Sequence, residues 1–252
     1  MTFNELQDKL LNLKQNHSLV GLKAGTEVES MNFDEIYLMK QLSDGILPLT
    51  VKIGGPEARN DVIQCIKIGV DNILAPMIES PYGLKNFAKA VSSIDINGNM
   101  KLCINIETIY AYRNFLDIIK SPYFQYLDRV TIGRSDLAAS LELHPDNPDV
   151  MQITKDIVML SKKNHKKTSV GGTINIMNAK SIQNEICPDY INSRHMILDA
   201  FSIDINFDIQ KALQWEIDFY CLLKNHFPHK KPFYQMQIHT LEKRLNFAFS
   251  PK

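Results

Sequence analysis

Short apolar segments alternate with helical segments along most of this chain, and this alternation restricts the possible folds more than any other feature. Between the predicted strands, apolar residues recur at helical spacing, and one strand with its helix takes about 25 to 30 residues. This period is typical of a parallel α/β barrel, in which each strand is followed by a helix. Seven strands can be identified, at residues 19–24, 49–53, 72–75, 102–108, 130–132, 168–173 and 190–198.

The eighth strand of a complete barrel cannot be located. We therefore predict a (β/α)8 TIM-type barrel that is modified or has one degraded strand. An open, doubly wound sheet is the structural alternative. No Gly-x-Gly-x-x-Gly follows any predicted strand, which argues against the dinucleotide-binding form of that sheet. Length and composition agree with a barrel, because 252 residues of which 44% are hydrophobic can form one sizeable core.

The C-terminal part of the chain departs from the alternation. A long helix is predicted from about residue 207 to 225, and it contains the only tryptophan, Trp215. A break at residues 227–232 separates it from a further amphipathic helix at 235–245. We therefore divide the chain into a barrel domain, residues 1–206, and a C-terminal helical extension, residues 207–252, that packs on the barrel or on a neighbouring subunit.

Charge and cysteine content exclude several classes of function. Lysine plus arginine and aspartate plus glutamate number 28 each, so the chain lacks the basic excess that nucleic-acid binding needs. The four cysteines form no metal-binding or redox spacing and are expected to be reduced thiols. The N-terminus has no signal-peptide pattern, and no apolar run approaches the length of a membrane span. We expect a cytoplasmic protein with no membrane partner.

Two carboxylates at the ends of neighbouring strands are the strongest candidates for chemistry. Glu107 lies at the end of the strand at 102–108, and Asp136 follows the strand at 130–132 after Gly133. The carboxyl ends of parallel strands meet at one edge, where active sites of such folds are found. Two acids there suit a hard cation such as Mg²⁺. The alternative interpretation is that each acid only caps the following helix.

Other polar residues near strand ends have both a functional and a structural interpretation. Lys52 lies in an apolar strand and either reaches the strand end or faces a substrate anion. Gly54 with its neighbour Gly55 brings backbone amides towards an anion or forms a plain turn. Glu27 and Glu29 are groups at the barrel mouth or solvated loop acids. The remaining candidates are Glu79, which also fits an ordinary turn, and Arg194 or His195, one of which should point into the barrel.

No motif for a nucleophile is present: the chain has no Gly-x-Ser-x-Gly, no P-loop and no HExxH. Its candidate groups are acids, a metal site and cationic side chains. Such a set is suited to polarising a carbonyl and stabilising an enolate rather than to acyl-enzyme chemistry.

Four segments resemble, in order and spacing, the HpcH/HpaI aldolase and citrate lyase β-subunit superfamily. They are Lys52-Ile-Gly-Gly, Ala75-Pro-Met-Ile-Glu-Ser, Ile104-Asn-Ile-Glu-Thr and Ile132-Gly-Arg-Ser-Asp-Leu. The resemblance extends over about residues 19–197. It implies a modified barrel of the phosphoenolpyruvate/pyruvate-binding type and the making or breaking of carbon–carbon bonds through a metal-bound enolate. In the family a first barrel strand precedes the equivalent segments, and its counterpart here is missing or much degraded.

The resemblance also implies roles for individual residues. Mg²⁺ or Mn²⁺ would be held by Glu107 and Asp136, and backbone amides around Gly133 and Ser135 would hold the substrate carboxylate. The family's early-strand arginine falls at Lys52, which keeps the charge but loses the bidentate geometry. Glu27 is the counterpart of an acid in the lyase branch. The histidine base of the aldolase branch has no equivalent here, and the C-terminal helices of related proteins, which cross between subunits, imply a homo-oligomer.

We therefore predict a divalent-metal-dependent carbon–carbon lyase or aldolase, similar to citrate lyase, that acts on a 2-oxo acid or acyl substrate. Catalytic roles are predicted for Lys52, Glu27 and Arg134, and substrate contacts for Gly54, Gly133, Ser135, Glu79 and Arg194. One alternative is a phosphoenolpyruvate/pyruvate-type transfer enzyme, for which Arg134 and Arg194 provide further cationic groups. Another is a non-catalytic barrel that serves as a binding or assembly subunit, which the lysine at position 52 and the missing base favour.

Overall fold

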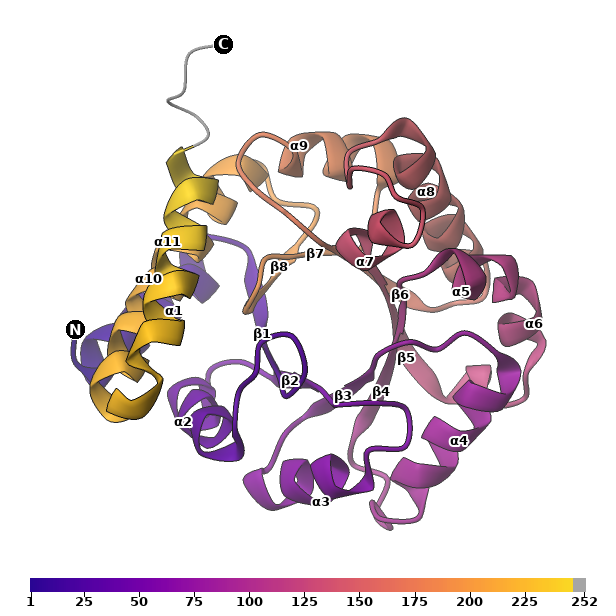
Figure 1. Ribbon diagram of the computed structural model, residues 1–252, viewed down its shortest axis with the longest axis horizontal. Coiled ribbons are helices and arrows are strands. Elements are labelled where there is room, and N and C mark those ends of the chain that lie inside the picture. Colours follow the sequence, from indigo (N-terminus) through magenta and orange to yellow (C-terminus); the bar gives the residue numbers. More distant parts are fainter. Residues whose placement is uncertain (247–252) are drawn as a thin grey trace.

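A closed barrel of eight strands forms the centre of the computed structural model, which describes residues 1–246 (Figure 1). Residues 247–252 of the predicted extension lie outside the described part. The strands, in their order around the barrel, are β1 (Leu19–Gly25), β2 (Leu49–Lys52), β3 (Asn72–Ala75), β4 (Lys101–Ile106), β5 (Leu127–Gly133), β6 (Lys167–Gly171), β7 (Tyr190–Asn192) and β8 (Met196–Asp199).

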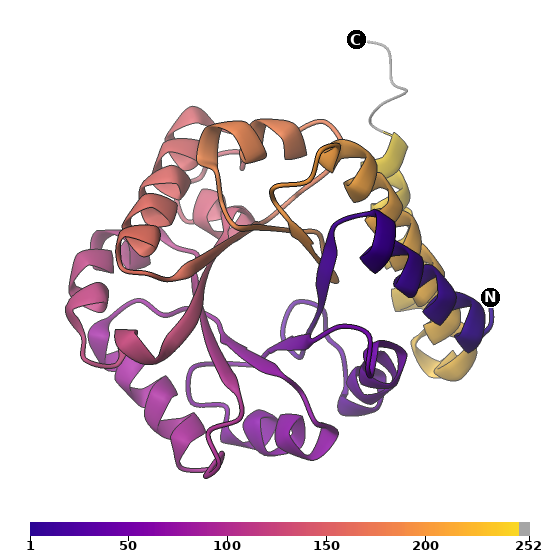
Figure 2. The same ribbon diagram turned by 180° about the vertical axis from the view of Figure 1, so that it is seen from behind.

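Helices surround the barrel and cover the outer face of its strands (Figures 1 and 2). The α-helices are α1 (Phe3–Asn16), α2 (Phe33–Ser43), α3 (Arg59–Ile68), α4 (Pro81–Ser92), α5 (Ile109–Arg113), α6 (Phe115–Lys120), α7 (Arg134–Ala139), α8 (Pro148–Lys163), α9 (Ala179–Ser181), α10 (Ile205–His226) and α11 (Lys231–Asn246). Short 3₁₀ turns at Phe124–Tyr126 and Pro228–Lys230 and a π-helical turn at Ile182–Ile186 complete the described elements. The barrel class predicted from the alternation is confirmed.

The last strand differs from the prediction. Strands β1 to β7 run parallel to one another, but β8 is antiparallel to both of its neighbours, β7 and β1. The segment 190–198, predicted as one final strand, is a hairpin that contains both β7 and β8. The count of seven strands and the strict alternation with helices are therefore wrong at this point. The irregular strand of the barrel is β8, and its pairing with β1 (Leu19–Gly25) closes the barrel.

A turn without glycine or proline joins β7 to β8. It consists of Ser193, Arg194 and His195, and the Ser193 backbone N–H donates to the carbonyl of Met196 at 3.0 Å. The Ser193 hydroxyl and the His195 backbone N–H both donate to one carboxylate oxygen of Glu216 on α10. A partner distant in sequence thus stabilises the turn, and this explains why local sequence signals do not reveal it.

Several helix boundaries coincide with local capping residues. Asn32 caps α2 by accepting from the Glu35 backbone N–H at 2.9 Å, with Glu35 completing a capping box. Ser80 caps α4, whose first residue is Pro81. Gly69 ends α3 with φ of 80°, a left-handed conformation that glycine adopts at little cost.

The two C-terminal helices pack against the barrel of their own chain. α10 lies beside α1, and the buried Trp215 donates from Nε1 to the Leu6 carbonyl at 3.0 Å. α11 packs on the outside of α10 (Figure 1), and Lys230 just before it contacts the buried Glu35 carboxylate at 2.7 Å. The predicted boundary after residue 206 falls within the first turn of α10. The division into two domains and the packing on a neighbouring subunit stay predictions.

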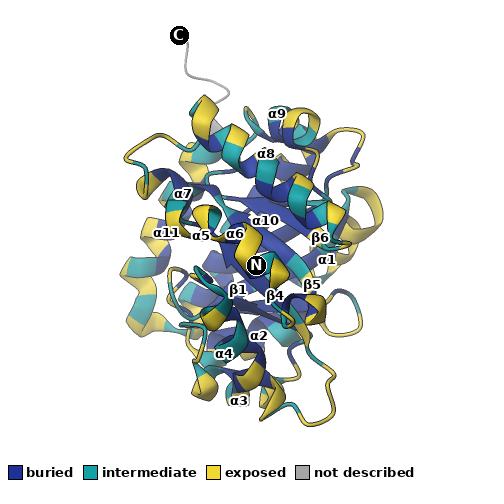
Figure 3. Cartoon of the chain, turned by 90° about the vertical axis from the view of Figure 1, so that its right-hand side faces the viewer, coloured by how far each residue is buried: buried dark blue, intermediate teal, exposed yellow. Residues whose placement is uncertain are grey.

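Buried side chains concentrate in the barrel strands and on the inner faces of the helices (Figure 3). Burial of this apolar surface is the main favourable contribution to folding and holds the strand ends rigidly. In the described part of the chain, none of the helices combines the length and the apolar composition needed to span a bilayer.

Candidate active site

A cavity opens at the carboxyl ends of the parallel strands, and the β7–β8 turn lies at the same end. Its lining includes both carboxylates that the sequence analysis proposed for a metal. The polar and glycine residues that line it are Lys23, Glu29, Lys52, Asn105, Glu107, Thr131, Gly133, Ser135, Asp136, Gly171, Gly172, Thr173, Asn192, Ser193, Arg194 and Arg244. Of the predicted site residues, Lys52, Glu107, Gly133, Ser135, Asp136 and Arg194 are in this set.

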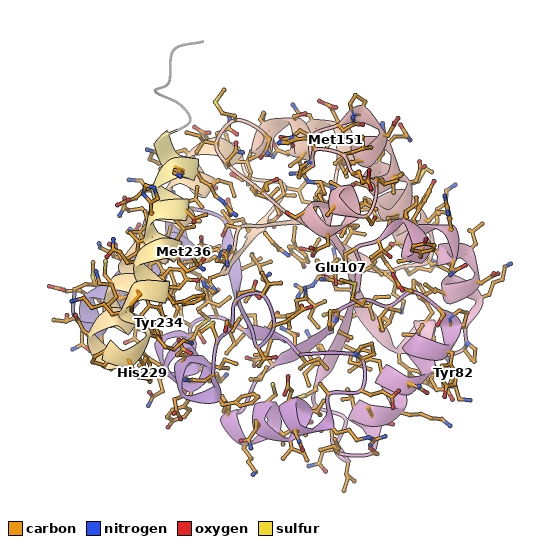
Figure 4. The ribbon with its side chains drawn as sticks, viewed as in Figure 1. Tyr82, Glu107, Met151, His229, Tyr234 and Met236 are labelled. Atoms are coloured by element: carbon orange, nitrogen blue, oxygen red, sulfur yellow. The ribbon has the colours of Figure 1, made fainter. Side chains whose placement is uncertain are left out.

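Glu107 directly follows β4 and is held rigidly in the cavity wall (Figure 4). Its side chain is 1% exposed; Oε1 accepts from the Met77 backbone N–H at 3.0 Å and Oε2 from Asn105 Nδ2 at 2.7 Å. Met77 has φ of 51°, a strained conformation for a residue with a side chain, and it donates to Glu107 from this position.

Gly133 makes room for the Glu107 carboxylate. It ends β5, next to β4, and a Cβ atom at Gly133 would lie 2.8 Å from Glu107 Oε2. Such a contact is shorter than van der Waals packing allows, so only glycine is tolerated here without displacing Glu107. In this Gly-x-x-Asp segment, Gly133 thus leaves space for the Glu107 carboxylate, and Asp136 three residues later supplies the second carboxylate.

Lys52, the last residue of β2, lies between two acids. Its Nζ is 2.7 Å from Glu27 Oε2 and 3.5 Å from Glu107 Oε2, and the residue is only 5% exposed. Burial opposes the charged form of Lys52, but the charges of Glu107 and Glu27 outweigh burial and raise its pKa. The lysine is therefore a permanent cation in the centre of the cavity.

The pKa of the Glu107 carboxyl is not lowered, as it would be in an isolated ion pair. Lys52 would lower its pKa, yet burial, together with the negative charge of Asp136, raises the pKa of Glu107 above its ordinary value. The two acids thus lie close enough to repel each other. A divalent cation between them would relieve both the repulsion and part of the cost of burial.

A second ion pair lines the β1 side of the cavity. Lys23 Nζ lies 3.1 Å from Glu29 Oε1, and Glu29 is 5% exposed. Burial raises the pKa of Glu29, but Lys23 and His195 outweigh burial and hold it at about 2. The carboxylate folds back over Gly25, where a Cβ atom would collide with Glu29 Oε2. Glu29 is therefore a fixed negative charge rather than a proton acceptor near neutral pH.

Three buried polar atoms of the cavity lining have no hydrogen-bond partner: Glu29 Oε2, Asn105 Oδ1 and Thr131 Oγ1. Buried polar atoms are nearly always satisfied, so atoms of this kind in a cavity indicate the place of a ligand or ion. Asn105 on β4 and Thr131 on β5 lie on the side of Glu107 and Asp136, and carboxylates with neutral oxygens form the donor set that Mg²⁺ or Mn²⁺ uses. Among residues 1–246 there is no cluster of three or more His, Cys, Asp and Glu side chains that suits a metal, which makes a zinc-type site a poor description. The residues present fit a hard cation held by two carboxylates.

Four predicted site residues lie outside the cavity lining. One of them, Glu27, contacts the lining through Lys52, and the other three are Arg134, Glu79 and Gly54. The Arg134 side chain is completely buried and points away, donating to the carbonyls of Pro145 and Gly172 and to Asp146 Oδ1 at 2.8 Å. These contacts join α7 to the segments before α8 and after β6, so the prediction of a catalytic role for Arg134 is contradicted by its position. A position after a strand end does not determine where a side chain points, and the start of α7 directs the Arg134 side chain away from the cavity.

Glu79 and Gly54 also have structural contacts in place of the predicted substrate contacts. The Glu79 carboxylate accepts from the Thr108 hydroxyl at the start of α5. The Gly54 backbone N–H donates to Asp61 Oδ2 at 2.8 Å, and the Thr26 hydroxyl binds the same oxygen at 2.7 Å. These contacts agree with the structural interpretation, in which both residues belong to turns.

The sequence analysis did not identify Lys23 and Arg244 as lining residues, and it did not decide between Arg194 and His195. Of the pair Arg194 and His195, Arg194 lines the cavity, whereas His195 is buried between the Lys23 carbonyl and the Tyr220 hydroxyl. Arg244 enters the cavity from α11, and no sequence signal connects that helix to the strand ends. Lys23 could have been found, because it is a charged residue within an apolar strand, as Lys52 is.

The structure thus defines the class of the protein as an eight-stranded α/β barrel with two carboxylates and a lysine at its strand ends. A model of the family described as "HpcH/HpaI aldolase/citrate lyase" matches residues 49–174, which is half of the chain. The chain therefore belongs to the HpcH/HpaI aldolase/citrate lyase family. This match contains β2 to β6, and so Lys52, Glu107 and Asp136.

Solved structures agree with this fold. A HpcH/HpaI aldolase/citrate lyase family protein from Burkholderia cenocepacia J2315 is 14% identical, with a TM-score of 0.59 over 72% of this chain and 80% of that chain. A HpcH/HpaI aldolase from Desulfitobacterium hafniense DCB-2 is 12% identical, with a TM-score of 0.59 over 74% and 80%. The citrate synthase SbnG is 14% identical, with a TM-score of 0.56 over 70% and 77%. No curated protein sequence matches the chain.

Proposed function

We propose that this protein is a divalent-metal-dependent carbon–carbon lyase or aldolase that acts on a 2-oxo acid or a related carboxylate. Family membership supports the aldolase/citrate lyase class. The observation that carries the metal-dependent part is the pair of facing carboxylates, Glu107 and Asp136, in a cavity whose neutral oxygens lack partners. An aldolase and a citrate synthase are among the similar solved structures, which is consistent with this reaction class.

In this proposal Glu107 and Asp136 hold Mg²⁺ or Mn²⁺. When bound, the cation polarises the carbonyl of the oxo acid and favours negative charge on its oxygen. Asn105 and Met77 fix the Glu107 carboxylate through their hydrogen bonds, so that it does not need to reorganise when a ligand arrives.

Lys52 provides the cationic side chain beside this position. Its ammonium is shared between Glu27 and Glu107, and the raised pKa keeps it protonated. We propose that it turns from these acids towards the charge that develops on the substrate oxygen when the carbon–carbon bond breaks. Glu27, which is one-third exposed, would lose its partner in that step.

The backbone amides after Gly133 are the proposed contact for the substrate carboxylate. Gly172 packs directly over them: a Cβ atom there would lie 2.5 Å from the Ser135 nitrogen. Glycine at position 172, with φ of 90°, leaves this backbone accessible from the cavity. Leu74, Ile132 and Ile174 contribute the apolar part of the lining and limit water around the reacting carbon.

The experiment is a cleavage assay with a set of 4-hydroxy-2-oxo acids and citrate, in which the release of a smaller oxo acid is followed with Mg²⁺, with Mn²⁺ and with a chelator. Asp136→Asn should lower the rate on the order of a thousandfold, because one of the two ligands of the cation loses its charge. Asp117→Asn on α6 is the matched control, since Asp117 is 67% exposed and lies outside the cavity. Turnover that persists with chelator, or that Asp136→Asn leaves intact, would contradict the proposal.

A further inference from the structure

Cationic side chains gather on the side of the cavity that faces away from Glu107 and Asp136. Arg194 comes from the β7–β8 turn, Arg244 from α11 and Lys23 from β1. In the closed barrel, β8 and β1 are three or four positions away from β4 and β5, so the two groups occupy opposite walls. Figure 1 shows the same separation, with α11, β1 and β8 on one side and β4 and β5 on the other.

The two arginines differ from the two lysines of the cavity in their partners. Lys23 is paired with Glu29, and Lys52 is paired with Glu27 and Glu107. Within residues 1–246, no carboxylate oxygen lies within the 4.0 Å limit of an ion pair from either Arg194 or Arg244. Two arginines without an acidic partner in one cavity are an arrangement that a bound anion stabilises.

The surroundings of Arg244 disfavour its positive charge. Burial lowers the pKa of Arg244 and the positive charge of Arg194 lowers it further, whereas Glu216 and Tyr220 oppose the shift. One oxygen of Glu216 already accepts from the Ser193 hydroxyl and the His195 backbone N–H. The other oxygen of Glu216, Oε2, is buried without a hydrogen-bond partner. Glu216 therefore attracts Arg244 without forming an ion pair with it, and both arginines line the cavity.

We propose that Arg194 and Arg244 bind a second anionic group of the substrate, a carboxylate or a phosphoryl group at the end remote from the oxo acid. The proposal rests on the proposed function only for the oxo-acid end of the ligand. It names the substrate class as a dianion that extends across the cavity, from the Glu107 and Asp136 wall to the arginine wall. The C-terminal helix then takes part in substrate selection, because it supplies one of the two arginines.

The test measures binding by calorimetry for pyruvate, 2-oxoglutarate and phosphonopyruvate in the presence of Mg²⁺. The wild type should bind at least one of the two dianions about tenfold or more tightly than pyruvate, which corresponds to a charge-assisted hydrogen bond. The tighter of the two identifies the distal group as carboxylate or phosphoryl. Arg244→Gln and Arg194→Gln should each reduce the ratio of dianion to pyruvate affinity about tenfold.

The matched control is Lys243→Gln, which removes one positive charge from an exposed position next to Arg244. It should leave the affinity ratio as in the wild type. Melting temperatures establish that each variant is folded, and Arg244→Lys serves as a second variant that keeps the charge and loses the bidentate geometry; it should give an intermediate ratio. No preference for dianions in the wild type, or an equal effect of Lys243→Gln and Arg244→Gln, would overturn the proposal.

Glutarate without metal separates this proposal from the function it extends. Glutarate has two carboxylates but no oxo group, so its binding does not depend on Glu107 and Asp136 holding a cation. Glutarate binding that Arg244→Gln weakens supports the arginine site even if Mg²⁺ and pyruvate fail to bind. Pyruvate binding with Mg²⁺ but no arginine-dependent difference among the ligands supports the proposed function and overturns the arginine site.

Discussion

Removing the charge of Lys52 tests the electrostatics of the cavity most sharply. In Lys52→Met the aliphatic part of the side chain is kept, but Glu107 remains 1% exposed, close to Asp136, with only neutral donors around it. A charge pair at 3.5 Å contributes about 4 to 5 kcal/mol at the effective dielectric of about 20 that applies in proteins. Loss of one partner of a buried pair costs about 3 to 5 kcal/mol, so we expect this decrease in the free energy of unfolding.

The decrease should depend on pH. Glu107 already has a raised pKa in the folded protein, and Lys52→Met raises it further because the main positive neighbour is lost. A raised acid pKa means that the folded state prefers the protonated carboxyl, so the destabilisation is largest above the folded pKa and becomes smaller as the pH falls below it. Combining Glu107→Gln with Lys52→Met should restore most of the stability at high pH, because the unpaired buried charge is then removed.

The assay is urea unfolding at about pH 8 and about pH 5, followed by the fluorescence of Trp215, the only tryptophan, and by circular dichroism as a check for a two-state transition. Lys120→Met is the control, because Lys120 is 74% exposed and its pairing with Asp117 contributes little. A cost below about 1 kcal/mol at the higher pH, or one that does not change with pH, would refute the reasoning.

Further predictions concern residues with one dominant contact. Asp146→Asn should lower the melting temperature, because the buried Arg134 loses its ion pair with Asp146, while oxalate affinity stays as in the wild type; a large loss of affinity would show that Arg134 does act in the active site. Gly133→Ala should weaken Mg²⁺-dependent oxalate binding at least about tenfold by displacing Glu107, whereas Gly55→Ala, with open space around its Cβ, should not; equal titration curves for the two variants would contradict the role of Gly133. Glu29→Gln should cost about 3 kcal/mol at neutral pH; the folded pKa of about 2 lies below the ordinary 4.5, so this contribution is present above about pH 4.5 and is lost as the pH falls towards about 2. Denaturation curves of Glu29→Gln and wild type that stay equally far apart down to acid pH would disprove this linkage.

Local periodicity predicted most of the barrel, because each strand and helix from residue 3 to 171 carries its own apolar pattern and capping signals. Asn32, Ser80 and Gly69 illustrate this, since the contacts that end each helix are within a few residues. The β7–β8 hairpin could not be predicted in the same way. Its turn is stabilised by Glu216, a residue more than twenty positions away, and nothing in residues 190–198 distinguishes one long strand from two short ones.

The same contrast applies to the candidate site. Lys52, Glu107, Gly133 and Asp136 follow or end strands, and the rule that strand ends meet places them in one cavity. That rule fails for Arg134, because it does not specify the direction of a side chain at the start of a helix. It also cannot identify Arg244, whose position depends on how the C-terminal helices pack against the barrel.

The central claim is that Glu107 and Asp136 together hold a divalent cation to which an oxo acid binds. The most direct measurement is calorimetric titration of Mg²⁺ and Mn²⁺ into wild type, Glu107→Gln and Asp136→Asn, each with and without oxalate. We predict that the wild type binds the cation, that oxalate tightens this binding, and that both variants lose both effects. Cation binding that survives both substitutions, or a folded wild type that binds neither cation nor oxalate, would contradict the account.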